Sequence, residues 1–291
     1  MTKSNNLFEF ERNFSACSTL EGEPTLCKNF EGERKTIVIG TDEAGRGPGA
    51  GGVFASAVYF PDPNKELIKK LAFLNDSKKL SKKKREELYE IIIENAIHST
   101  VCVEVEEIEK INILNASLKA MKLAVENVIN EMQSCIDAKT QSDATLVEKR
   151  NLEMCHCEER GTSDAAIQKK SSHLSPLTSH ILVLVDGNKL IKNFPSPLGG
   201  EGRVRVNITQ KFIIKGDSKS ASIAAASILA KVSRDRYMKE LGKKFPQYNW
   251  GQNAGYLTAE HLDAIDKYGL TPIHRKSFLR KHNAKQLSLL N

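Results

Sequence analysis

Short runs of β-branched and aromatic residues, separated by glycine- and proline-rich turns, predict a sheet. The first two runs, residues 37–39 and 53–60, follow one another closely, which favours an antiparallel hairpin. Residues 100–105 alternate apolar and polar positions and predict a third strand. Residues 181–185 are apolar without alternation, as expected of a central strand that is buried on both faces. A fifth run, at residues 211–214, predicts another strand.

Longer segments with helical spacing predict helices around this sheet. Ser81 is a good N-cap for a helix that runs to about residue 97. Residues 114–132 carry apolar positions on one side, which indicates a core-facing helix. A helix over residues 218–244 is rich in alanine and can therefore pack closely on the sheet. A shorter helix is expected at residues 258–268. The fold class predicted is α/β.

Four segments lack sustained periodicity. Residues 1–33 and 281–291 read as polar tails, the first of them disordered. Residues 133–179 are too long to be a structureless loop inside a compact domain, so we interpret them as an insertion. Residues 195–207, rich in glycine and proline, predict a second and shorter insertion. One domain, residues 34–280, remains.

Acidic residues recur where the predicted strands end. Asp42 and Glu43 come directly before a Gly-Arg-Gly turn, and Asp186 and Asp217 each follow a later apolar run. Since sites gather at the carboxyl ends of strands in α/β sheets, these acids can converge. Asp42 and Glu43 can serve one site only if the strand bends or finishes there, because neighbouring side chains of a regular strand point to opposite faces. Taken alone, the pair is equally compatible with an acidic turn that closes a hairpin.

Four converging carboxylates would repel one another unless divalent ions compensated their charge. Hard oxygen ligands without a matching Cys or His cluster favour Mg²⁺ or Mn²⁺, and a pair of such ions can hydrolyse a phosphodiester. The chain has 43 Lys and Arg against 36 Asp and Glu, a formal net charge of +7, which weakly favours a polyanionic partner. Cys155, His156 and Cys157 are a weak zinc signal, because no second pair stands at suitable spacing.

No apolar run reaches the length of a membrane span, and the first residues lack the pattern of a secretory signal. We therefore expect a cytoplasmic protein without a membrane partner. Its six cysteines show no spacing typical of a disulfide framework.

Candidate contacts to nucleic acid are basic, polar and aromatic. Arg46 and nearby lysines suit phosphate binding, and the ring of Tyr256 can pack on a sugar or a base. Ser77 and Lys78 lie in a basic loop that suits phosphate contact. The alternative is a solvated lysine cluster, which is how we interpret residues 82–84. Asn112 stands near a helix start, where it either caps the helix or contacts substrate.

The ordered set of motifs resembles bacterial ribonuclease HII over residues 36–279. The matching stretches are Thr41-Asp42-Glu43-Ala44-Gly45-Arg46-Gly47-Pro48, Asp76-Ser77-Lys78-Lys79-Leu80, Val185-Asp186-Gly187-Asn188, Lys215-Gly216-Asp217-Ser218, the run from Ala225 to Asp235, Gly255-Tyr256 and His274-Arg275-Lys276-Ser277-Phe278.

The resemblance implies a ribonuclease H-like fold, a mixed five-stranded sheet flanked by helices, with a C-terminal helical region. It makes Asp42, Glu43, Asp186 and Asp217 the catalytic metal ligands, with two Mn²⁺ or Mg²⁺ ions in the substrate complex. The expected substrates are RNA/DNA hybrids and duplex DNA containing single ribonucleotides, as in replication and repair. The backbone of residues 45–47 and Tyr256 would read the junction. Cleavage 5′ to the ribonucleotide would leave a 3′-hydroxyl and a 5′-phosphate.

We also expect a monomer. The two insertions depart from the family pattern and flank the strand that carries Asp186. If they splay this strand, the chain would instead be an inactive protein that binds RNA/DNA hybrids. A third hypothesis is a related ribonuclease H that needs several consecutive ribonucleotides.

Overall fold

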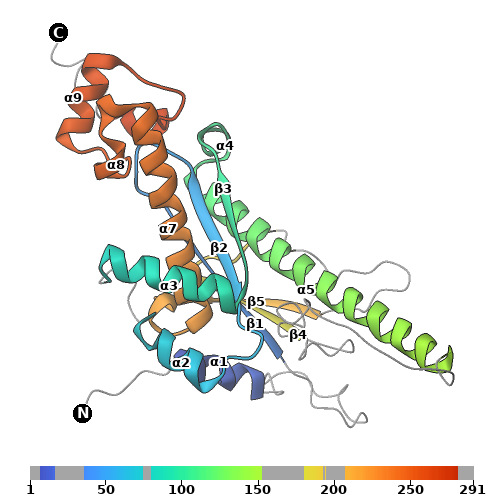
Figure 1. The fold of residues 1–291 in the computed structure, drawn as a ribbon. Coiled ribbons are helices and arrows are strands. Elements are labelled where there is room, and N and C mark those ends of the chain that lie inside the picture. The colour runs from blue at the N-terminus through green and yellow to red at the C-terminus, as the bar shows by residue number, and fades with distance from the viewer. Residues whose placement is uncertain are drawn as a thin grey trace, which may run out of the picture.

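The computed structural model of the chain describes residues 7–16, 36–74, 80–152, 180–192, 194 and 207–280, with the backbone alone at 15–16 and 136–152. A five-stranded sheet with the order β3-β2-β1-β4-β5 lies at its centre (Figure 1). β2 is antiparallel to β1 and β3, whereas β4 is parallel to β1 and β5, so the predicted mixed sheet and first hairpin are confirmed. The strands are β1 (Thr36–Ala44), β2 (Val53–Tyr59), β3 (Ile97–Val103), β4 (His180–Asp186) and β5 (Asn207–Ile213).

The topology brings the carboxyl ends of β1, β3, β4 and β5 to one edge of the sheet. β2 runs the other way and begins at this edge, where Ala44 pairs with Phe54. Ligand sites in sheets of this kind gather outside the carboxyl ends of the strands. This edge is therefore where the predicted acids have to be sought.

Two long helices cover opposite faces of the sheet (Figure 1). α5 (Ile113–Leu152) packs on side chains such as Ile39 and Val183, which alternate along their strands with residues that face the other helix. α7 (Ala221–Lys244) covers that second face together with α3 (Lys82–Asn95). The three alanines at 224–226 in α7 are fully buried, as close packing of this helix requires.

α5 is longer than the predicted helix. Its backbone continues through residues 133–152, so the first part of the predicted insertion is helical. These residues include Ala, Gln, Lys, Glu and Leu, which favour a helix even where no apolar periodicity marks a buried face. The remainder of that predicted insertion, residues 153–179, lies outside the described residues, as do residues 195–206 of the second one, whose last residue, Asn207, begins β5.

The predicted N-terminal tail is wrong for residues 7–16, which form the packed helix α1 (Leu7–Ala16). Leu7 and Phe8 are buried, and the ring of Phe8 lies 5.4 Å from that of Phe60 in an edge contact. Glu11 is also buried, beside the N-terminus of α7. The mostly polar composition of residues 1–33 hides this short amphipathic segment.

A small helical region stands at the far end of α7, distant from α1 (Figure 1). Trp250 and Tyr248 stack at its centre, with ring centroids 5.0 Å apart. Thr258 caps α9 by accepting from the amide of His261, as predicted for a helix starting there. The region comprises η3 (Pro246–Tyr248), α8 (Trp250–Asn253), α9 (Ala259–Tyr268) and η4 (Lys276–Leu279).

Three shorter elements complete the described chain: α2 (Lys65–Lys70), the 3₁₀ turn η1 (Leu71–Leu74) and α4 (Val105–Ile111). None of the helices within the described ranges combines the length and hydropathy that crossing a bilayer demands.

Candidate active site

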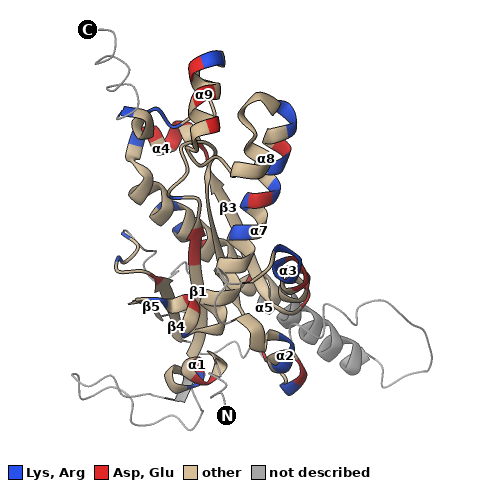
Figure 2. Ribbon diagram, turned by 90° about the vertical axis from the view of Figure 1, so that its left-hand side faces the viewer, with Lys and Arg blue, Asp and Glu red and all other residues tan. Residues whose placement is uncertain are grey.

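Asp42 and Glu43 lie within β1, directly before its last residue, Ala44. The pairing with β2 continues through both of them, Asp42 opposite Ser56 and Glu43 opposite Ala55. The strand therefore does not finish at the acids. Asp42 is only 7% exposed and accepts from its neighbour's amide, Glu43 N, at 2.7 Å. In Figure 2 acidic residues are visible on the strand labelled β1, whereas most other charges lie on the outer helices.

Asp186 ends β4 next to Asp42. The parallel register pairs Thr41 with Val185, so the next position on each strand carries one of the two acids. One carboxylate oxygen of Asp186, Oδ1, accepts from the amide of Gly216 at 2.7 Å. This hydrogen bond ties the end of β4 to the turn that follows β5. The prediction that Asp186 stands at a strand exit beside Asp42 is confirmed.

Asp217 does not lie at the end of a strand. β5 stops at Ile213, and Asp217 sits in the short 3₁₀ turn η2 (Gly216–Ser218). The turn begins from Lys215, whose backbone is left-handed with φ of 55°, and the Ser218 hydroxyl donates to the Lys215 carbonyl at 2.9 Å. Asp217 is thus one residue beyond the amide that binds Asp186. Its place directly after Gly216 supports the prediction that Asp217 converges with the other three acids, and this convergence stays a prediction.

The acids on β1 and β4 act on one another electrostatically. Burial raises the pKa of Asp42 well above its usual range, and the negative charges of Glu43 and Asp186 raise it further, while a hydrogen bond from Ser227 opposes them. Burial also raises the pKa of Glu43, against the effect of Arg46, whose Nη1 lies 3.0 Å from the Glu43 Oε1. Among the described residues, the three acids therefore repel one another, and Arg46 offsets part of this repulsion at Glu43.

The donors at this site are all oxygen atoms, the type that Mg²⁺ and Mn²⁺ prefer. Within the part of the chain that the structure describes, no group of three or more His, Cys, Asp or Glu side chains is arranged so that it could hold a metal ion by itself. Mg²⁺ is commonly bound by one or two carboxylates plus substrate phosphates, and such a site needs no complete protein cage. The acid cluster therefore fits a divalent ion whose remaining ligands come from substrate and water.

Residues 45–52, which we call the glycine loop, connect β1 to β2 beside the acids. Gly45 has φ of 95°, and a Cβ there would lie 2.1 Å from the Arg234 Nε. A Cβ on Gly47 would lie 3.4 Å from the Tyr256 ring, so the exposed loop residue and this ring are neighbours. Tyr256 itself is 52% exposed. The loop and the aromatic ring, far apart in sequence, therefore form one surface next to the acids.

The other predicted contacts stand differently. Ser77 and Lys78 lie outside the described residues, as do the three residues of the weak zinc motif at 155–157. Asn112 caps α5, since its Oδ1 accepts from the Asn115 amide at 3.1 Å. Its backbone has φ of 67°, which an asparagine tolerates better than most residues. The capping interpretation of Asn112 is confirmed, and a substrate contact by it stays a prediction.

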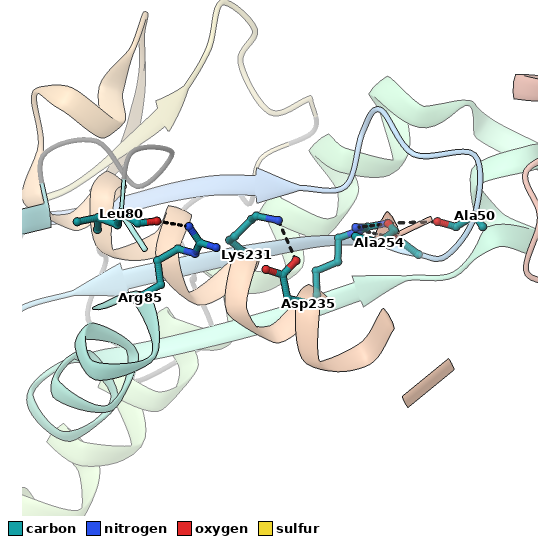
Figure 3. Close-up of polar contacts among 8 residues, drawn as sticks. Ala50, Leu80, Arg85, Lys231, Asp235 and Ala254 are labelled. Atoms are coloured by element: carbon teal, nitrogen blue, oxygen red, sulfur yellow. Dashed lines mark hydrogen bonds and ion pairs between the residues drawn. The ribbon is translucent and has the colours of Figure 1, made fainter. Parts of the chain in front are cut away.

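The sequence analysis missed the role of Arg234. Asp235, its neighbour in the sequence, binds Lys231 at 2.8 Å, while Arg234 donates to the carbonyls of Ala50 and Ala254 (Figure 3). The i to i+4 spacing of Lys231 and Asp235 could have indicated their pair. Nothing local in the sequence indicates that an arginine of α7 reaches backbone carbonyls some 180 residues away in the chain.

Two buried histidines hold the segment behind Tyr256. The Trp250 Nε1 donates to the His261 Nε2 at 2.9 Å, which leaves the His261 Nδ1 to donate to the Tyr256 carbonyl at 2.9 Å. The His274 Nδ1 accepts from the Thr271 amide at 2.9 Å, so its Nε2 carries the proton and faces His261 at 3.2 Å. Both rings are neutral in this network, because a second proton on either would set two donors against each other.

This network predicts a loss of stability in mild acid. Burial, and then the neighbouring His261, lowers the pKa of His274 to about 4 from 6.5. The unfolded chain takes up this proton first, so stability is complete above about pH 6.5 and falls as the pH drops towards 4. We expect His274→Asn to remove about 3 kcal/mol of this pH dependence, measured by urea unfolding at several pH values. If the free energy of unfolding falls equally steeply with decreasing pH in His274→Asn and in the control His98→Asn, the prediction is wrong.

Comparison with known proteins gives one consistent result. The family model described as Ribonuclease HII matches residues 39–179 and 130–282. A Ribonuclease HII of Rickettsia akari is 40% identical over 244 residues, covering 83% of this chain and 91% of the relative. That of Fusobacterium nucleatum is 40% identical over 245 residues, 84% of this chain and 86% of the relative. The crystal structure of Bst-RNase HIII in complex with Mn²⁺ shares the fold, with a TM-score of 0.51 and 15% identity over 97% of this chain and 82% of that one.

Proposed function

Since the chain belongs to the ribonuclease HII family, we propose that it is an endoribonuclease that hydrolyses the RNA strand of RNA/DNA hybrids and cuts 5′ to single ribonucleotides in duplex DNA. The products would be a 3′-hydroxyl and a 5′-phosphate. The observation that carries the proposal is the cluster of Asp42, Glu43 and Asp186 beside the exposed glycine loop and Tyr256. It places groups suited to metal-assisted hydrolysis next to groups suited to reading a nucleic-acid backbone.

Asp42, Glu43, Asp186 and Asp217 would hold the divalent ions, two Mg²⁺ or Mn²⁺ in the substrate complex. When bound, such ions neutralise the phosphate and lower the pKa of a water molecule to make it a nucleophile. The contribution of the protein itself is to hold the carboxylates in position. The Gly216 amide holds Asp186 at the end of β4, and Ser227 and the Glu43 amide hold Asp42 on β1. Carboxylates fixed in this way need little rearrangement before reaction.

Recognition of the ribonucleotide would take place at the glycine loop. A 2′-hydroxyl is what distinguishes RNA from DNA, and a close approach of backbone to sugar needs residues without a side chain, as at Gly45 and Gly47. The ring of Tyr256, exposed and next to Gly47, would pack on the neighbouring sugar or base. Arg46, half exposed beside Glu43, would contact a phosphate.

The direct test is divalent-ion-dependent cutting of a duplex that contains one ribonucleotide. We expect Tyr256→Ala to lower kcat/KM on this duplex about tenfold, since stacking on an aromatic ring contributes about 1–3 kcal/mol. Tyr268→Ala is a matched control, because Tyr268 is 54% exposed, similar to Tyr256, but lies at the end of α9. Equal losses in both variants would show that the effect is not local to the junction.

The same assay separates the alternatives. Binding without cutting in both Mg²⁺ and Mn²⁺ would favour a hybrid-binding protein inactivated by its insertions. Since α5 continues to Leu152, the informative deletion begins after it, at residues 153–179, and should restore activity in that case. Cutting of an all-RNA strand but not of a single ribonucleotide would indicate the related type of ribonuclease H.

The monomeric state and the cytoplasmic location remain predictions. Sedimentation of the purified chain with and without a hybrid duplex tests the first of them, and a mass of one chain per duplex is the expected result.

A further inference from the structure

Two buried arginines hold the carbonyl groups of the glycine loop. Arg234, on α7, donates from Nη2 to the Ala50 carbonyl at 3.2 Å and from Nε to the Gly52 carbonyl at 3.4 Å. Its Nη1 donates to the Ala254 carbonyl at 3.0 Å, two residues before Tyr256. Arg234 therefore joins the loop to the segment that carries the exposed ring. Figure 3 labels two of its carbonyl partners, Ala50 and Ala254.

Arg275 holds the first part of the same loop. Its Nε donates to the Gly51 carbonyl at 2.8 Å, and its Nη1 donates to the carbonyls of Pro48 at 2.9 Å and Arg46 at 3.4 Å. The backbone amide of Arg275 also donates to the Gly49 carbonyl at 2.8 Å. Every carbonyl from residue 48 to 52 thus accepts from one of the two arginines. The side-chain bonds among these need the planar fork of N–H groups that a guanidinium provides, and the ammonium group of lysine has no such fork.

The two guanidinium groups bring positive charge beneath the loop. Arg275 is fully buried, and its Nη2 has no hydrogen-bond partner within the described ranges. Over the same ranges neither arginine forms an ion pair with a carboxylate. Burial, and then the neighbouring Arg234, lowers the pKa of Arg275 to about 10, and the group stays charged at neutral pH. Carbonyl dipoles offset the cost of burying these charges only in part.

The amides of the loop divide into two groups. Those of Gly49 and Ala50 donate to the Gly255 carbonyl, and that of Gly51 donates to the Ile273 carbonyl. In contrast, the amides of residues 45–47 donate to no backbone carbonyl among the residues that the structure describes. Residues 46 and 47 are also exposed. Within these ranges the arginines bind the carbonyls of the loop, and the amides of residues 45–47 stay available to an external acceptor.

We infer that Arg234 and Arg275 are positioning residues for substrate recognition, which shape the glycine loop so that the amides of residues 45–47 bind a backbone oxygen of the ribonucleotide. Neither arginine touches the substrate. The inference rests on the proposed function, because it explains how the loop would read a 2′-hydroxyl.

The test compares affinities in the Asp186→Asn background, which is expected not to cut. The probes are two duplexes of one sequence, with and without a single ribonucleotide, and the readout is the ratio of their Kd values. Arg275→Lys keeps the charge and loses the fork, so we expect this ratio to fall about tenfold with the same salt dependence of binding. Destabilisation alone would lower the folded fraction but leave the ratio unchanged.

Arg236→Lys is the matched control. Arg236 also lies on α7 but pairs with Glu86 and Glu90 at the surface, and its replacement should not alter the ratio. An unchanged ratio in Arg275→Lys would overturn the inference, whereas no preference in the Asp186→Asn parent would overturn the proposed junction recognition instead. If Arg275→Lys does not fold, as judged by its melting curve, Arg234→Lys decides by the same ratio.

Discussion

Asp186→Asn is expected to lower the rate of cleavage by about 10³-fold, the scale on which loss of one essential charged or polar group acts in a preorganised site. Asparagine keeps the size of the side chain, and its Oδ1 can still accept from the Gly216 amide, so the end of β4 should stay in place. What it loses is the negative charge that would hold a divalent ion. Single-turnover cutting of a duplex with one ribonucleotide measures the rate, with Mg²⁺ and with Mn²⁺.

Substrate binding should survive this change, because the glycine loop and Tyr256 are untouched. We expect the Kd for the duplex to change less than about threefold, measured by gel shift. Glu66→Gln is a suitable control, since Glu66 pairs with Lys70 on exposed α2 and follows the end of β2 far from the acids. A loss of affinity as large as the loss of rate would mean that Asp186 serves binding and not the chemical step.

Glu11→Ala should destabilise the fold by about 3 kcal/mol, because it leaves buried donors without an acceptor. The Glu11 carboxylate accepts from the Ser222 amide at 2.7 Å, from the Ser222 hydroxyl at 3.1 Å and from the Ser220 hydroxyl. These donors belong to the first turn of α7, where a helix leaves its amides unsatisfied. Urea unfolding at neutral pH measures the loss.

Two variants sharpen this result. Glutamine keeps one oxygen that can accept from the Ser222 amide, so Glu11→Gln should lose less stability than Glu11→Ala. Glu9→Ala, on the exposed side of α1, should leave the free energy of unfolding nearly unchanged. Wild-type stability in Glu11→Ala would mean that α1 does not hold α7 in solution.

Much of the fold follows from local patterns. The apolar runs predict the strands, because side-chain alternation and β-branching depend on neighbours in sequence. Caps behave likewise: Ser81 accepts from the Lys84 amide, as its position before α3 predicts. α1 could not be found in this way. Its burial depends on Phe60 and on the start of α7, and neither partner is visible from residues 7–16.

The candidate site, too, could be predicted only where local sequence patterns determine it. That Asp42 and Asp186 meet could be predicted, since both follow apolar runs and parallel strands end at one edge. The position of Asp217 in a turn beyond β5 could not, because it depends on the left-handed backbone at Lys215. Nor could the arginines beneath the glycine loop, whose hydrogen bonds join residues more than 180 positions apart.

The order of the strands has a consequence for folding. β1, β2 and β3 pair within the first 103 residues, whereas β4 and α7 come later in the chain. Non-local pairings form slowly, because the chain must close a long loop before they contribute. During synthesis Asp42 can therefore stay in water, paired only through the backbone of the first hairpin. Asp42 loses its water and meets the charge of Asp186 only when β4 and α7 dock. By then β1, β2 and β3 have already paired, and their stability can offset these two unfavourable free energies.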